Sequence, residues 1–292
     1  MMKYWVINMQ LNTTTNSGLE QRLELFEPAI GEEEVGTTFK KNENERELFE
    51  KHREKYSASI YVPDWQEVVL VLEGSNPSVN PRNLELLTTT SYHLQAVRKG
   101  GANDITPISV EGLILTRDNK FVYGIRGGNV ERGKVCVSPA GSLSNHHKGD
   151  NPLFATLYKE LREELGIETE ASDKPILIGY QTDPDFTKGV NFVFYMHSGK
   201  SSKEIDEKHK EALDVYQRAL SKNVPEVEAR KEIGRAGFPN IDAWEHTNLV
   251  FVDDNPKMID RIIQSRRVPH DGKEYPVLDI GRGALILYKA CP

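Results

Sequence analysis

Cysteine is scarce in this chain, with only Cys136 and Cys291 among 292 residues. Two cysteines this far apart do not supply the disulfide framework of a small secreted domain, so a reducing compartment is expected. The sequence also contains no apolar run of membrane-spanning length, and its first ten residues lack the apolar core of a signal peptide. These absences predict a cytoplasmic protein that does not enter a membrane.

An excess of positive charge is missing as well. The chain has 37 Lys and Arg against 44 Asp and Glu, which gives a formal net charge of −7. This balance offers no electrostatic reason to expect a nucleic acid polymer as ligand. Free nucleotides stay open as ligands, because divalent metal ions neutralise their phosphates.

One glycine-rich stretch, Lys99–Asn103, has the composition of a linker between domains. It predicts an N-terminal domain over residues 1–100, whose fold the sequence leaves uncertain, and a second domain over residues 104–292. In the first domain Val68–Leu72 predicts a strand; Leu84–Val97 has no clear assignment, although its first part, L-E-L-L-T-T-T-S-Y, has strand-like composition. The chain is long enough to build a core in each domain.

The second domain alternates strands and helices around a glycine-containing loop. A hairpin, the loop, an amphipathic helix and two further strands indicate an α/β (α+β) fold with a mixed sheet and packed helices. A polar insertion over about 200–235 predicts a helix broken near Pro225, either a lid beside a site or a surface hairpin. The predicted elements are strands at Ile108–Thr116, Phe121–Arg126, Val135–Val137, Ile176–Thr182, Val190–His197 and Asn248–Val252, and helices at Ala155–Ile167 and Asn255–Gln264.

The helix at Ala155–Ile167 carries the strongest chemical signal. Its leucines recur every fourth residue, which is typical of an amphipathic helix. Glu160, Glu163 and Glu164 fall at helical spacing, so their like charges share one face. A hard cation such as Mg²⁺ prefers oxygen ligands and relieves this repulsion. The alternative is a solvated acidic face, partly compensated by neighbouring basic residues.

The run Lys159–Ile167, K-E-L-R-E-E-L-G-I, resembles the core of the Nudix box, R-E-U-x-E-E-x-G-U with U a bulky aliphatic residue. The match departs from the pattern only at Lys159, where the family has arginine. Upstream, Gly141 in S-P-A-G resembles the glycine that opens the family's loop. The spacing to the helix is longer than in the family, so the loop glutamate falls on Asn151, with Asp150 as the nearby carboxylate.

The resemblance implies a Nudix-type pyrophosphohydrolase that uses Mg²⁺ or Mn²⁺. Its substrate would be a small nucleoside diphosphate linked to another group, and a homodimer is left open. The resemblance implies Glu160, Glu163 and Glu164 as metal ligands, with Glu163 and Glu164 counted as catalytic. Gly141 and Arg126 would contact substrate; Arg126 equally suits a strand end in solvent. The rival interpretation is a Nudix-like nucleotide-binding or regulatory module with little hydrolytic activity.

The general base lies outside the motif. Glu245 is the first choice because it immediately precedes a predicted strand, although an exposed strand-edge carboxylate is an equal alternative. Asp183 and Asp185 are rivals on a turn, and the Asp253–Asp254 pair suits a helix cap better. Other candidates with weaker support are His146 and His147 for phosphate contact, and Phe186 and Trp244 for stacking on a base.

Overall fold

A computed structural model describes residues 7–56, 68–75, 79–127, 131–143, 151–169, 173–185, 188–238 and 241–291. The chain forms two compact units. Unit 1 consists of Met1–Val110, Gly141–Thr156 and Ile176–Val193, and unit 2 of Glu111–Ala140, Leu157–Pro175 and Phe194–Pro292. Residues after the predicted linker therefore contribute to the same unit as those before it. The domain boundary at Lys99–Asn103 remains a prediction.

Unit 1 is built on strands β1 (Ile7–Thr14) and β2 (Glu20–Ile30), which pair antiparallel along their length. Strand β10 (Ile176–Asp183) pairs antiparallel with the other edge of β2, placing Tyr180 opposite Glu24. Two segments about 150 residues apart in sequence thus become neighbours. The other strands of unit 1 are β3 (Thr37–Lys40), β4 (Val68–Glu73), β5 (Leu84–Thr90) and the first halves of β6 (Ile105–Leu115) and β11 (Gly189–His197).

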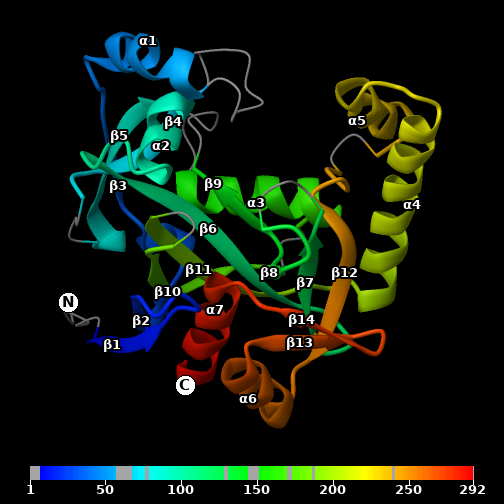
Figure 1. The fold of residues 1–292 in the computed structure, drawn as a ribbon. Coiled ribbons are helices and arrows are strands. Elements are labelled where there is room, and N and C mark those ends of the chain that lie inside the picture. Colours follow the sequence, from blue (N-terminus) through cyan, green and yellow to red (C-terminus); the bar gives the residue numbers. More distant parts are fainter. Residues whose placement is uncertain are drawn as a thin grey trace. The chain divides into compact units, whose positions relative to one another are not determined.

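Two helices, α1 (Glu45–Tyr56) and α2 (Ser91–Arg98), pack against β5 in unit 1 (Figure 1). The hydroxyl of Thr90 accepts the backbone N–H of His93 and so begins α2. The segment Leu84–Val97, which the sequence left unassigned, is therefore a strand followed by a helix, and its strand-like first part lies mostly in β5. Side chains of β4, β5, α2 and β6 form a small hydrophobic core in this part of unit 1, made of Val69, Val71, Leu87, Leu94, Val97 and Ile105.

Unit 2 is organised around β7 (Lys120–Arg126), a buried strand with partners on both sides. It pairs antiparallel with β12 (His246–Asp253) and with β8 (Val135–Val137), and at Leu115 with the end of β6. The C-terminal part adds α6 (Pro256–Ser265), the hairpin of β13 (Arg267–His270) and β14 (Lys273–Pro276), and α7 (Asp279–Ala290).

Helix α3 (Pro152–Leu165) confirms the predicted amphipathic helix. Leu157, Leu161 and Leu165 are each no more than 1% exposed, so the leucine stripe is core as expected. Gly166 follows the helix with φ of +62°, and a side chain there would approach Ile241 to 2.7 Å. The left-handed backbone conformation therefore favours the glycine that ends the motif.

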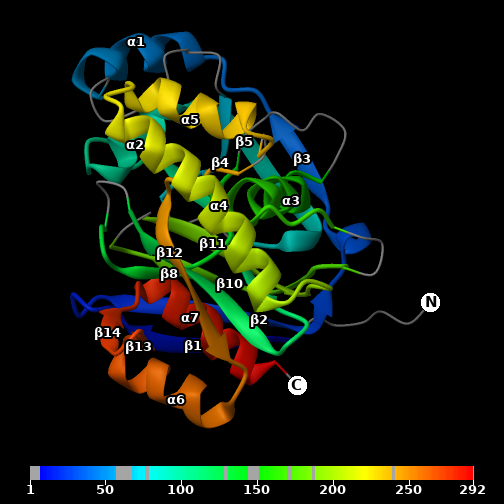
Figure 2. The same cartoon turned by 90° about the vertical axis from the view of Figure 1, so that its right-hand side faces the viewer.

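The insertion forms two helices in unit 2, α4 (Ser202–Ser221) and α5 (Glu226–Arg235), with Pro225 between them as predicted. Figure 2 shows α4 running past β12 with α5 folded against its end. Ser201 and Glu204 form a capping box at the start of α4. Buried side chains from both helices join the loop before β12, namely Ala212, Leu213, Ile233, Ile241 and Ala243.

Parallel pairing of β3 with β5 occurs beside antiparallel pairing elsewhere, so the fold is mixed α/β, as predicted. In the part of the chain that the structure describes, no helix is both long and apolar enough to cross a membrane.

Candidate active site

The three motif glutamates on α3 differ in how far they are withdrawn from water. The side chain of Glu164 is 3% exposed, that of Glu160 13% and that of Glu163 31%. One face of α3 in unit 2 thus carries three carboxylates that differ in their solvent exposure. The deepest one has the most hydrogen-bond partners.

Glu164 is held by three donors. Its carboxylate accepts hydrogen bonds from Ser138 Oγ at 2.7 Å, His246 Nε2 at 3.0 Å and the backbone N–H of Ala140 at 3.1 Å. Burial alone raises the pKa of Glu164, but these bonds outweigh it and leave the pKa below its ordinary value. Glu164 is therefore an ionised, fixed carboxylate, and Nε2 of His246 must carry the proton that it donates.

The position of His246 depends on Gly124 of the neighbouring strand. A Cβ atom at Gly124 would lie 2.3 Å from Nδ1 of the His246 ring, so the imidazole fills the space where a side chain would stand. The register between β12 and β7 shifts between His246 and Asn248. Within the described residues Nδ1 of His246 has no hydrogen-bond partner. Packing on β7, rather than a second hydrogen bond, orients this ring.

Glu160 and Glu163 share a single cation. Nζ of Lys159 lies 2.7 Å from Glu163 and 3.3 Å from Glu160. Burial and the charge of Glu164 raise the pKa of Glu160 to about 8, against the opposing effect of Lys159. Burial lowers the pKa of Lys159, but the two glutamates outweigh it and the net change is upward. One ammonium group therefore leaves the charge on this face only partly compensated.

Two further carboxylates come from the turn before β12. The backbone N–H of Asp242 donates to the Glu163 carbonyl, which ties this turn to the end of α3. Burial, then Glu163 and Glu245, raise the pKa of Asp242 to about 7. Burial and the charge of Glu164 also raise the pKa of Glu245, opposed by His246 and by Arg126 at the end of β7. Both Glu245 and Arg126 are thus electrostatic neighbours of the helix glutamates' site.

The donor chemistry of this cluster suits a hard divalent cation, because its carboxylates repel one another and offer oxygen ligands. Among the described residues, however, no three His, Cys, Asp or Glu side chains are already arranged around a common point for a metal. Glu163 is engaged by Lys159, and Glu164 by its three donors. The assignment of Glu160, Glu163 and Glu164 as metal ligands remains a prediction.

The loop half of the motif has a structural role at the start of α3. The side chain of Asn151 accepts the N–H of Leu153 and donates to the Val35 carbonyl, so the predicted loop-glutamate position begins the helix instead. Gly141 lies in β9 (Ala140–Ser142), directly after the residue whose N–H binds Glu164. The other loop candidates, and one aromatic, lie outside the described residues: His146, His147, Asp150 and Phe186.

The remaining candidates have other partners. Asp183 is buried in unit 1, where it accepts the N–H of Asp185. Asn255, and not the Asp253–Asp254 pair, caps α6 by accepting the N–H of Lys257. Trp244 lies beneath the guanidinium of Arg230, which is 4.8 Å from the ring centre.

Sequence reasoning did not single out Ser138, Asp242 or His246, and its assignment of roles to the glutamates remains a prediction. Asp242 and His246 stand three residues before and one residue after the predicted Glu245. The contacts of Ser138 and His246 with Glu164 join positions 26 and 82 residues away along the chain. No local pattern reveals them.

No protein-family model and no curated protein matches this chain. Among solved structures, it aligns with a Deinococcus radiodurans protein at 12% identity and a TM-score of 0.36, covering 62% of this chain and 83% of the other. A bifunctional NMN adenylyltransferase/ADP ribose pyrophosphatase from Francisella tularensis, complexed with AMP and manganese, aligns at 12% identity and a TM-score of 0.39. That alignment covers 68% of this chain but only 46% of the Francisella enzyme.

A MutT/nudix family protein from Enterococcus faecalis aligns at 16% identity and a TM-score of 0.27, covering 33% of this chain and 38% of the other. At such scores, the similarities assign neither a family nor an activity to the chain.

Proposed function

We propose that this protein is a Nudix-type hydrolase that uses Mg²⁺ or Mn²⁺ to cleave a diphosphate bond in a nucleoside diphosphate linked to another group. The observation that carries the proposal is that burial and mutual repulsion raise the pKa of the carboxylates beside Glu164 more than nearby cations such as Lys159 lower it. Such an arrangement raises the pKa of Glu160 to about 8 and that of Asp242 to about 7. A bound divalent cation removes this electrostatic cost.

Each side chain has a role in the proposed reaction. Glu160 and Glu163 would hold the metal together with Glu164, whose remaining lone pairs are available beside its three hydrogen bonds. The metal, when bound, neutralises phosphate charge and lowers the pKa of a coordinated water. Glu245 would accept the proton of the attacking water. Arg126 would bind a phosphate oxygen of the substrate.

The test is a panel of ADP-ribose, UDP-sugars, dinucleoside polyphosphates, coenzyme A and nucleoside triphosphates, each assayed with Mg²⁺, with Mn²⁺ and with chelator. We expect metal-dependent release of two phosphate-containing or nucleotide products from at least one class. A calorimetric titration with Mn²⁺ is an independent readout, and Glu160→Gln should weaken it by about tenfold. Glu168→Gln, an exposed carboxylate just past α3, is the matched control. Absence of both metal binding and turnover would overturn the proposal.

The second candidate is a Nudix-like nucleotide-binding or regulatory module. It is favoured by Asn151, which caps α3 where the family has a carboxylate, and by the three donors that already engage Glu164. This candidate predicts metal-dependent binding of a nucleotide without its consumption. The calorimetric and product measurements on the same panel separate the two functions.

A further inference from the structure

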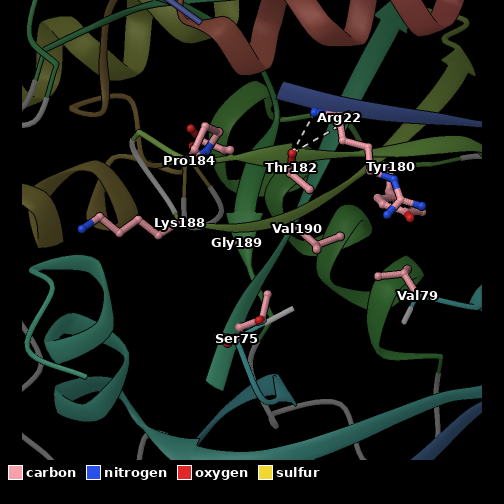
Figure 3. Close-up of a pocket in the computed structure, with 11 residues that line it drawn as sticks. Arg22, Ser75, Val79, Tyr180, Thr182, Pro184, Lys188, Gly189 and Val190 are labelled. Atoms are coloured by element: carbon pink, nitrogen blue, oxygen red, sulfur yellow. Dashed lines mark hydrogen bonds between the residues drawn. The ribbon is translucent and has the colours of Figure 1, made fainter. Parts of the chain in front are cut away.

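Unit 1 contains a pocket that the proposed hydrolase chemistry does not use. Its volume is about 420 Å³, and it is lined by β2, β10 and the start of β11 together with residues near the end of β4 (Figure 3). This volume lies within the range of small-molecule sites and is much larger than one inorganic ion requires. The pocket therefore has room for an organic ligand.

One wall of the pocket is a preformed polar network. Glu24 is 5% exposed and accepts hydrogen bonds from Arg22 Nη2 at 2.5 Å and from the Tyr180 hydroxyl at 2.6 Å. The backbone N–H of Arg22 donates to Thr182 Oγ1 at 2.9 Å, which joins β2 to β10 (Figure 3). The Arg22 guanidinium also lies 6.0 Å from the centre of the Tyr180 ring. Arg22 is thus held on β2 with its side chain 45% exposed.

The network leaves donors on Arg22 for a ligand. A guanidinium has five N–H donors in a planar fork that matches phosphate and carboxylate oxygens. Glu24 takes one of these donors, and the guanidinium forms no other hydrogen bond to the residues that the structure describes. An exposed arginine fixed by a buried carboxylate is preorganised, so little side-chain entropy is lost when an anion binds.

The charge balance of the lining also favours an anion. Lys188 stands at the opposite end of the pocket from Arg22 and forms no ion pair with the residues that the structure describes (Figure 3). Asp183 is the carboxylate in the lining, and it is buried beside the cation of Arg98, whose pKa it raises against the lowering effect of burial. Because Glu24 pairs with Arg22 and Arg98 lies beside Asp183, Lys188 leaves these described residues with a surplus of one positive charge.

The middle of the pocket is apolar. Val79 and Val190 are 9% and 4% exposed, and Pro184 and the Tyr180 ring extend the same lining. Figure 3 shows Val190 between the Lys188 end and the Arg22 end. A ligand that uses the whole pocket therefore combines an anionic group with an uncharged organic body.

We propose that this pocket binds a small organic phosphate of nucleoside monophosphate size, with its phosphate on Arg22 and its uncharged body against Val79, Val190 and Tyr180. Arginine favours phosphate through bidentate hydrogen bonds, and the positive charge of Lys188 adds attraction for a second negative charge. The pocket shares no lining residue with the carboxylate cluster, and the proposal does not rest on the proposed hydrolase function.

The test is isothermal titration of the full chain with AMP as the probe, in the presence of chelator so that no divalent metal contributes. We expect saturable binding of one AMP per chain. Inorganic phosphate and adenosine, titrated alone, should each bind at least tenfold more weakly, because each uses only part of the pocket. Arg22→Gln should weaken AMP binding by at least tenfold, and Arg46→Gln, an exposed arginine on α1, should leave it unchanged.

A second variant keeps the test decisive if Arg22→Gln fails to fold. Lys188 is exposed and has a left-handed backbone with φ of +51°, a conformation that asparagine adopts readily. Lys188→Asn therefore removes the charge without disturbing the fold and should weaken AMP several-fold. Glu160→Gln should bind AMP as the unmodified chain does, which separates this site from the proposed metal site.

The proposal is overturned if AMP gives no binding at millimolar concentration. It is also overturned if a folded Arg22→Gln variant binds AMP as tightly as the unmodified chain, or if Glu160→Gln loses binding. Should Arg22→Gln not fold, unchanged AMP binding by Lys188→Asn overturns it.

Discussion

Glu24 in unit 1 and Glu160 in unit 2 are both carboxylates largely withdrawn from water, but only one is fully matched by donors. Glu24 receives hydrogen bonds from Arg22 and Tyr180. Glu160 shares Lys159 with Glu163 and faces the charge of Glu164. The first arrangement is electrostatically complete without an added ion and leaves donors for an anion. In the second, ionising Glu160 is unfavourable unless a cation binds beside it, which is what a cation-dependent site requires.

Glu164→Gln should have the largest effect, because it removes the helix carboxylate that three hydrogen bonds hold in its ionised form. We expect turnover of the substrate identified by the panel to fall by on the order of a thousandfold, within the range for loss of a positioned acid–base or charged group. The carboxamide replaces an acceptor oxygen facing Ser138 and His246, so the free energy of unfolding should drop by about 1–3 kcal/mol. Rate assays and urea unfolding measure the two effects.

The matched control for Glu164→Gln is Glu168→Gln, which changes an exposed carboxylate just beyond the same helix. It should alter neither rate nor stability measurably. Near-normal turnover of Glu164→Gln at saturating Mg²⁺ would remove Glu164 from the reaction and leave it a purely structural acceptor.

Glu245→Gln tests whether the raised pKa of this partly buried carboxylate serves proton transfer. We expect kcat to fall about a hundredfold, the lower end for a lost general base. Mn²⁺ affinity should be retained if Glu245 is the base and weakened if it is a ligand. Full activity of Glu245→Gln, together with loss of activity in Asp183→Asn or Asp185→Asn, would mean that the base lies on the other turn.

Gly124→Ala tests whether packing on β7 positions the donor that keeps Glu164 charged. The added Cβ would lie 2.3 Å from His246 Nδ1, so the ring has to move. Overpacking of this kind costs about 1–3 kcal/mol of unfolding free energy, and kcat should fall because Glu164 loses a fixed partner. Gly199→Ala, where the nearest atom is 4.0 Å away, is the matched control. Equal stability and rate in the two variants would show that His246 needs no such room.

The parts of the fold that the sequence predicted are those set by local pattern. The leucine repeat of α3 and the apolar run of β4 require only neighbours along the chain, and both are confirmed. The pairing of β2 with β10 depends on residues far apart in sequence, so the pocket around Arg22 left no local signal. Thr90 is a strand residue that also caps α2, and a composition rich in threonine does not separate the two roles.

The candidate site likewise has residues that local sequence spacing predicts and contacts that only the fold produces. Helical spacing alone put Glu160, Glu163 and Glu164 on one face, and an adjacent strand suggested Glu245. The donors to Glu164 come from β12 and from the segment after β8, and they are near only because β7 lies between these strands. The space for His246 is provided by a glycine on a third segment. Such three-segment contacts follow from the fold, and sequence spacing carries no information on them.

The smallest expected effect is the pH dependence of the free energy of unfolding, which tests the carboxylate cluster of unit 2 directly. The pKa of Glu160 rises from 4.5 to about 8 and that of Asp242 from 3.8 to about 7 on folding. Between these limits the folded chain holds protons that the unfolded chain has released. Stability therefore falls as pH rises from about 5 to about 8, because the native state binds more protons.

Urea unfolding of the metal-free chain at pH 5.5, 7 and 8.5 measures this effect against Glu160→Gln/Asp242→Asn, in which neither group titrates. Compared with the unmodified chain at the same pH, we expect the variant to gain stability between pH 5.5 and pH 8.5, because it has no Glu160 or Asp242 carboxyl to deprotonate. Saturating Mg²⁺ should stabilise the unmodified chain more at high pH, because metal binding displaces the same protons. An identical pH profile for the two chains, with and without Mg²⁺, would show that these carboxylates do not form a cation-dependent cluster.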